Sequence, residues 1–247
     1  MDSWELLYFS VMVVIATAVQ TITGFALGLI LVALCTAFGV MSVIDCAAIV
    51  SLVSMMNTGL LLRRSYRDLN GHVVMVIMLG LIPTLLLGFY WLDQVGHDQV
   101  SLLRTIIGAM VLVAGMTLML RPSPYSSLSA KPFFFGSGLI GGLFGGLFSA
   151  AGAPIAYLMY RQPLAISVIR SSLLAVFFLS TFVRAVTGGF AGHYTPDVLI
   201  KTLIAAPVML VTTMLIEPTL PAIPDQVVRR LVFLCLMALG LYLLLAP

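Results

Sequence analysis

Charged side chains are scarce in this chain of 247 residues, and their scarcity sets its class. Asp, Glu, Lys and Arg make up 9% of the sequence and apolar residues 61%, whereas an ordinary globular domain is about a quarter charged. A soluble protein of this size cannot hide so much apolar surface, because its own exterior must face water. The composition therefore excludes a soluble domain and predicts an all-α polytopic protein of the cell inner (plasma) membrane.

Sequence signatures of catalysis and of metal or nucleotide binding are also missing. The three histidines lie in or beside separate loops, and the chain has no phosphate-binding loop and no hydrolase or metalloprotease motif. The basic residues lie at loops, where they indicate membrane topology and not nucleic-acid binding. The cysteines lie in apolar runs without metal-ligand or disulfide spacing, which favours packing roles, and these are Cys35, Cys46 and Cys235. We therefore expect no enzyme, no cofactor and no metal.

Long stretches without charge predict how the helices divide. Residues 6–44 and 132–160 hold no Asp, Glu, Lys or Arg, and neither stretch fits one straight helix across a core about 30 Å thick. We expect breaks at Gln20–Gly24 and at Ser149–Gly152, which make two broken or re-entrant hairpins with arms too short for full spans. The predicted segments, about eight full spans plus short helices, lie near 5–20, 24–39, 41–62, 73–92, 100–120, 133–148, 153–160, 165–187, 197–216 and 226–246.

The two halves of the chain show the same order of segments. Each opens with a broken pair and continues with three fuller segments, and an offset of 125 residues pairs Asp45 with Arg170. We predict a first membrane repeat over 1–122, a cytoplasmic linker over 123–132 and a second repeat over 133–247. Basic residues in short loops place both termini outside the cytoplasm. Five segments in each half then make an inverted repeat, which is typical of secondary transporters.

The two breaks are the strongest candidates for a binding site. Irregular backbone inside a membrane is tolerated where it lines a cavity or is buried in protein, and transporters bind substrate between broken helices. The helix starts after each break would offer N–H groups to an anion. The candidate substrate-binding residues are Gln20, Thr21, Thr23, Gly24, Asn57, Ser149, Gly152, Pro154, Arg170 and Ser171. A second set of glycines at four-residue spacing is better explained by close helix packing, and it comprises Gly138, Gly142 and Gly146.

The few ionisable residues in apolar runs each allow two interpretations. Arg170 is either a fixed counter-charge for an anion or an interfacial arginine that reaches the headgroups. Asp45 is a candidate for coupling, although a place in the first turn of a helix is the favoured alternative. Arg184 lies near the external end of its segment and is expected to contact headgroups. Asn57 is either a contact between helices or a ligand contact.

Three segments resemble the TauE/SafE family of sulfite and organosulfonate exporters. They are Thr23–Val32, the glycine-rich run Gly141–Leu158 and the Arg-small-small segment Val168–Leu173. The resemblance spans nearly the whole chain and implies transport of a small sulfur oxyanion or a similar organic anion. It also favours a functional role for Arg170. The first hairpin departs from the family pattern, because it is poorer in glycine and carries polar residues such as Gln20 instead.

Two function classes remain open from the sequence. The first is a secondary transporter that exports sulfite or organosulfonate with proton or sodium coupling. The second is an anion channel, or a carrier for other small organic anions such as carboxylates. Saturable flux that depends on an ion gradient favours a carrier, and passive current at high rate favours a channel. Membrane lipid is an expected partner, nucleic acid is not, and a homodimer is a further hypothesis.

Overall fold

The described part of the chain consists of helices joined by short turns and loops. The computed structural model describes residues 3–23, 26–95, 100–119, 125–217 and 225–245. The helices, in order, are α1 (Ser3–Thr23), α2 (Leu27–Phe38), α3 (Val43–Ser65), the short 3-10 helix η1 (Tyr66–Asp68), α4 (Gly71–Val95), α5 (Val100–Met119), α6 (Lys131–Phe148), α7 (Gly152–Tyr160), α8 (Ile166–Phe190), α9 (Pro196–Ile216) and α10 (Asp225–Leu245). Each predicted segment corresponds to one α-helix, with ends that differ by a few residues.

The second predicted break is confirmed, and the first lies later than predicted. α6 ends at Phe148 and α7 begins at Gly152. α1, however, continues through Gln20 and Thr21 to Thr23. The Thr21 hydroxyl donates to the Thr17 carbonyl at 2.9 Å within the helix, and the Gln20 side chain bonds to α3. Both side chains are hydrogen-bonded while their residues keep helical backbone geometry, so they do not terminate α1.

The hairpins combine a long arm with a short one, which corrects the prediction of short arms for α1. Trp4–Ile22 of α1 is long and apolar enough to cross a membrane. α2 has 12 residues and α7 has 9, which gives lengths of about 18 and 14 Å. Both are well short of a hydrocarbon core of about 30 Å. α2 and α7 therefore end within the membrane if their partners cross it.

Five helical stretches of the described residues are long and apolar enough to span a membrane. They are Trp4–Ile22, Val43–Asp68, Gly71–Gln94, Ile166–Phe190 and Pro196–Ile216. Shorter apolar helices make up much of the rest, at Leu27–Phe38, Ser101–Met116 and Leu236–Leu245. This pattern agrees with a polytopic membrane protein. The count of about eight full spans stays a prediction.

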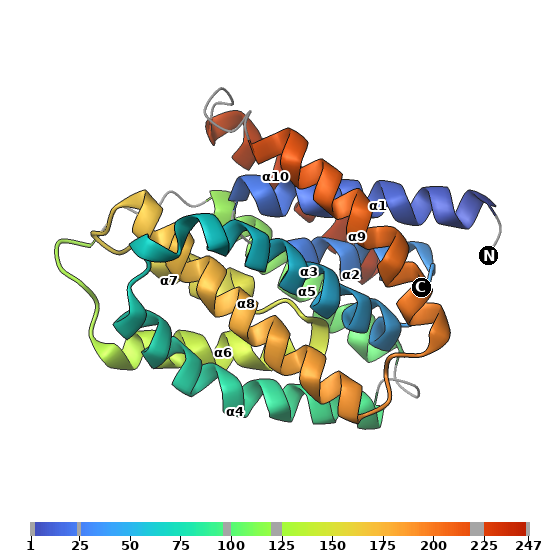
Figure 1. Cartoon of the computed structure of the whole chain (residues 1–247), viewed down its shortest axis with the longest axis horizontal. Coiled ribbons are helices and arrows are strands. Elements are labelled where there is room, and N and C mark those ends of the chain that lie inside the picture. Colours follow the sequence, from blue (N-terminus) through green and yellow to red (C-terminus); the bar gives the residue numbers. More distant parts are fainter. Residues whose placement is uncertain (1–2, 24–25, 96–99, 120–124, 218–224, 246–247) are drawn as a thin grey trace.

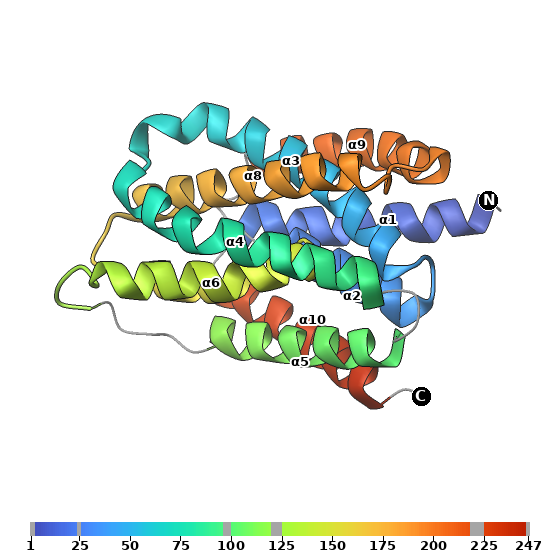
Figure 2. The same cartoon turned by 90° about the horizontal axis from the view of Figure 1, so that it is seen from below.

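The long helices lie roughly parallel to one axis and pack in pairs (Figures 1 and 2). α3 lies against α8, α4 against α6, α5 against α10, and α1 against α9. Figure 2 shows α5 and α10 along one side of the bundle and α3, α8 and α9 along the other. The short helix α2 is packed among its neighbours, and its residues from Leu27 to Ala33 are all buried.

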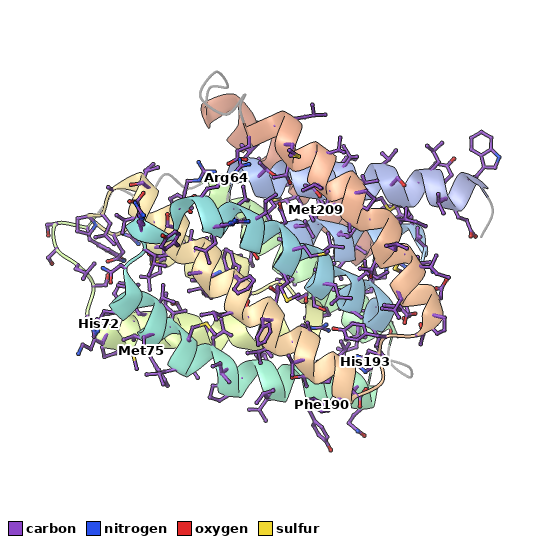
Figure 3. All side chains as sticks on the ribbon, viewed as in Figure 1. Arg64, His72, Met75, Phe190, His193 and Met209 are labelled. Carbon is purple, nitrogen blue, oxygen red and sulfur yellow. The ribbon has the colours of Figure 1, made fainter. Side chains whose placement is uncertain are left out.

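The bundle has two chemically different ends. His72 lies at one end and His193 at the other (Figure 3). The first, here called the basic end, holds η1 and the turn after α7, with Arg63, Arg64, Arg67 and Arg161. The other, here called the Asp93 end, holds the α8–α9 turn at 191–195. α1 begins and α10 ends toward the Asp93 end (Figure 2). Arg121, one of the residues that predicted the topology, lies outside the described residues.

Glycines bring α6 directly onto the backbone of α4. A Cβ atom on Gly138, Gly142 or Gly146 would lie far inside van der Waals contact with a carbonyl oxygen of α4, those of Ile77, Leu81 and Leu85 respectively. The same holds in reverse for Gly80 and Gly88 of α4 against α6. Small residues at four-residue spacing permit such approach between membrane helices. The packing interpretation of the α6 glycines is therefore confirmed.

Candidate functional site

A small cavity, lined almost entirely by buried residues, lies where the tips of the two hairpins meet. Its volume is about 30 Å³. Ala26–Leu29 at the start of α2 form one side and Ser149–Ala153 at the start of α7 form another. The remaining lining comes from Gln20, Ser54, Phe177, Ser180 and Thr181. Among these lining residues none is charged, so the cavity is neutral but rich in polar groups.

Direct backbone contact joins the two tips. A Cβ atom on Gly28 of α2 would overlap the carbonyl oxygen of Ser149. Glycine is therefore required at position 28, because any side chain would push the second tip away. This contact brings the two hairpin tips, which the sequence predicts as candidate binding sites, together inside the bundle.

Both tips hold a non-glycine residue in the left-handed region of backbone space. Ala26 has φ 90° and Ser149 has φ 55°, and no other non-glycine residue in the described ranges has a positive φ. Such a conformation costs on the order of 1–3 kcal/mol and persists where the surroundings enforce it. Both residues line the cavity. Local strain is therefore concentrated at this site, on both of its halves.

Several hydrogen-bond donors converge on the cavity. The first N–H groups of α2 and α7 have no acceptor within their helices, and neither helix has a side-chain cap. The hydroxyl of Ser149 is buried and has no hydrogen-bond partner among the described residues. Helix N-termini carry partial positive charge, which favours an anion. The arrangement can thus bind a small anion through backbone and hydroxyl donors without a charged side chain.

A neutral network of side chains, here called the amide cluster, adjoins the cavity. The Asn57 amide donates to Gln20 Oε1 at 3.2 Å, and the Thr213 hydroxyl donates to Asn57 Oδ1 at 2.8 Å. Gln20 Nε2 donates to the Ser54 hydroxyl at 3.4 Å. The cluster joins α1, α3 and α9. Asn57 is fully buried and makes contacts between helices, and it is not among the residues that line the cavity.

Of the residues predicted for the site, Gln20, Ser149 and Gly152 line the cavity. Four others do not line it, and these are Arg170, Ser171, Thr21 and Pro154. Arg170 is partly buried, and its Nη2 donates to the Thr21 carbonyl at 3.2 Å near the end of α1. Gly24 and the side chain of Thr23 lie outside the described residues.

The sequence-based prediction that Arg184 contacts headgroups is wrong, because the side chain is buried. Its exposed fraction is 1%. Nε donates to the Gly146 carbonyl at 3.0 Å and Nη1 to the Ala47 carbonyl at 2.8 Å. The guanidinium lies 5.4 Å from the centre of the Phe89 ring, and Nη2 is buried without a hydrogen-bond partner in the described structure. A buried arginine is costly inside a membrane and usually functional.

The spacing of Arg184 on α8 could have revealed its burial. Ser180 and Thr181 lie four and three positions earlier, so all three side chains share one face of the helix. Ser180 and Thr181 line the cavity. This face is hard to recognise from the sequence because Arg184 lies close to the predicted loop. Thr213 was also missed, because a threonine in an apolar run most often bonds to its own helix.

An aromatic cover lies over Arg184 at the Asp93 end. The Phe89 ring stacks on the His193 ring at 5.0 Å, and His193 Nε2 lies 2.8 Å from Asp93 Oδ1. In the α8–α9 turn, the Tyr194 hydroxyl donates to the Ala185 carbonyl at 2.8 Å. Burial raises the pKa of Tyr194, and a hydrogen bond with Ser51 and the charge of Arg184 oppose this only partly. The phenol therefore stays protonated at neutral pH and remains a donor.

Asp45 lies in the first turn of α3, as the favoured alternative expected. The Ser42 hydroxyl accepts from the Asp45 N–H at 3.0 Å and donates to Asp45 Oδ2 at 2.7 Å. This reciprocal pair stabilises the start of the helix, where a carboxylate also suits the helix dipole. A coupling role for Asp45 stays a prediction.

The fold and the cavity define a class: a polytopic helical membrane protein with a buried polar site between two half-length helices. The sequence pattern of the Sulfite exporter TauE/SafE family matches residues 9–243. The chain therefore belongs to the TauE/SafE family, which confirms the resemblance seen in its hairpin motifs.

A named relative supports the same assignment. It is a "Probable sulfite/organosulfonate exporter TauE" from Cupriavidus necator, 31% identical over 229 residues, which cover 93% of this chain and 90% of the relative. No solved structure gives a significant match to the chain.

Proposed function

We propose that this protein is a secondary transporter that exports small sulfur-containing anions, sulfite or an organosulfonate, across the cell membrane. Membership of the TauE/SafE family and the name of the relative support a sulfur anion as substrate. The observation that carries the proposal is the convergence on one cavity of two helix starts and of the Ser149 hydroxyl, which has no hydrogen-bond partner among the residues that the structure describes. The small volume of the cavity suits a compact oxyanion head, and the organic part of a sulfonate would require the tips to separate.

The helix boundaries support an inverted repeat. Leu27 and Gly152 begin α2 and α7, Gly71 and Pro196 begin α4 and α9, and Val100 and Asp225 begin α5 and α10. The members of each pair lie 125 positions apart, the offset that the sequence predicts. The pairing of helices follows the same relation, since α3 contacts α9 as α8 contacts α4. Two such repeats around a central site can alternate its access between the two faces of the membrane.

A ligand screen tests the proposal directly. The purified protein is heated with sulfite, sulfate, thiosulfate, sulfoacetate or small carboxylates, because a ligand at 100 times its Kd stabilises by about 2.7 kcal/mol. We expect sulfite or sulfoacetate to raise the Tm. The Ser149→Ala variant should lose most of that rise, while Ser137→Ala, which removes a buried hydroxyl of α6 that does not line the cavity, should keep it. A rise with carboxylates alone would reject sulfur anions as the substrate class.

A further inference from the structure

Two arginines of α8 bind the ends of the two long hairpin arms in the same way. Arg170 donates to the Thr21 carbonyl of α1 at 3.2 Å, and Arg184 donates to the Gly146 carbonyl of α6 at 3.0 Å. Each carbonyl lies two residues before the last residue of its helix. Such carbonyls lack a partner within the helix and carry its partial negative charge. Thr21 and Gly146 lie 125 positions apart, which is the offset of the repeat.

The two contacts bracket the cavity along one helix. Arg170 and Arg184 are 14 positions apart, or about 21 Å along α8, and the cavity residues Phe177, Ser180 and Thr181 lie between them. Arg170 is on the side of the basic end and Arg184 on the side of the Asp93 end. Each arginine therefore stands between the cavity and a different end of the bundle.

We propose that Arg170 and Arg184 are a matched pair of positioning residues, each of which holds one hairpin against α8 and closes the cavity toward its own end. This inference rests on the proposed function, because it assigns the two closures that alternating access requires. Loss of the Arg170 contact frees the end of α1 and opens the cavity toward the basic end. Loss of the Arg184 contact frees the end of α6 and opens it toward the Asp93 end.

The two closures differ in strength. Arg184 binds α6 and α3 together through Gly146 and Ala47, and it is fully buried beneath Phe89. Arg170 is only partly buried and binds the single carbonyl of Thr21 among the contacts described here. The cavity is therefore closed more firmly toward the Asp93 end. Opening it toward the basic end requires fewer arginine hydrogen bonds to break.

Cysteine labelling from one side at a time tests the pair. Ser180→Cys is placed in a chain whose own cysteines are replaced by alanine, and the protein is reconstituted in vesicles. The rate of reaction with a membrane-impermeant thiol reagent is measured from each face. Arg170→Ala should raise the rate roughly tenfold from the face with the basic end, the scale expected for one lost charge-assisted hydrogen bond. Arg184→Ala should raise it at least as much from the opposite face.

Controls separate positioning from loss of fold. Arg64→Ala removes an exposed arginine near the basic end that is paired with Glu217, and it should leave both rates unchanged. If Arg184→Ala does not fold, Arg184→Lys carries the test, because lysine keeps the charge but cannot span both carbonyls. It should show a smaller rise on the same face. Equal rises from both faces, or none in folded variants, would overturn the inference.

The same reporter keeps this inference distinct from the proposed function. Sulfoacetate does not react with the thiol reagent. When both arginines are intact, it should slow the labelling of Ser180→Cys in the chain whose own cysteines are replaced. Protection without any sided effect of the arginine variants rejects the matched pair alone. Sided effects without protection by any sulfur anion support the pair and reject the anion site.

Discussion

The long arms of the two hairpins, α1 and α6, are held by different kinds of contact. α6 lies directly on the backbone of α4 through five glycines, three on α6 and two on α4. Its counterpart α1 lies against α9, and neither of these helices contains a glycine in its described residues. Membrane helices gain much of their association from close backbone approach. The second hairpin is therefore built as a fixed element, and the first is the one that can move at lower cost.

The polar contacts near the cavity follow the same division. On the α1 side, the amide cluster is neutral, and Gln20, Asn57 and Thr213 satisfy one another. On the α6 side, Arg184 is a buried charge, and one of its nitrogens has no hydrogen-bond partner in the described part of the chain. A neutral network can break and re-form as helices shift, whereas a buried charge must keep its acceptors. We therefore expect the contacts on the α1 side to rearrange more readily than those on the α6 side.

The largest expected effect comes from breaking the glycine contact. Gly142→Leu should destabilise the protein by about 3 kcal/mol or more, because the side chain meets the rigid Leu81 carbonyl and cannot be accommodated by a rotamer change. Gly136→Leu on the same helix has open space around its Cβ position and serves as the control. Thermal unfolding and size-exclusion profiles in detergent measure both. A Gly142→Leu protein as stable as the control would contradict a fixed second hairpin.

The second largest effect is the loss of unfolding free energy when Arg184 or Arg170 is replaced. Arg184→Met should lower the free energy of unfolding by about 2 kcal/mol, because the Ala47 and Gly146 carbonyls lose their donor while relief of charge burial offsets part of that loss. Arg170→Met should cost about 1 kcal/mol, since one carbonyl loses its donor near a more polar surface. Denaturation of both variants in one detergent gives the ranking, and the reverse order would contradict the stronger closure at Arg184.

The sequence predicted the helices well because their limits are local features. The ends of uncharged runs, the basic residues in loops and the Ser149–Gly152 break each mark a helix end within a few residues of it. The end of α1 was misplaced because Gln20 is satisfied by Asn57, which lies 37 positions away. Arg184 was misassigned for the same reason, since its acceptor Ala47 lies 137 positions away. Burial that depends on distant partners cannot be read from a local pattern.

The third prediction tests whether the amide cluster acts as one unit. Asn57→Leu should cost about 1–2 kcal/mol, because Gln20 and Thr213 each lose a buried partner. Adding Thr213→Val should recover part of this loss, since removal of both partners leaves fewer polar groups unpaired. A double-mutant cycle of unfolding free energies measures the coupling. Strictly additive losses would show that the cluster does not hold α1, α3 and α9 together as a network.

The smallest expected effect separates helix capping from ion coupling at Asp45. Asp45 and Arg170 are paired by the repeat offset, yet the structure gives them different partners: Asp45 bonds to Ser42 within its own turn, and Arg170 binds another helix. Asp45→Asn keeps the shape of the side chain and removes its charge from the start of α3, which should cost about 0.3–1 kcal/mol. Anion flux into vesicles, and its dependence on a proton or sodium gradient, should stay unchanged. Flux that becomes independent of the gradient at unchanged stability would instead make Asp45 the coupling residue, and the asymmetry between the repeats would then extend to the driving ion.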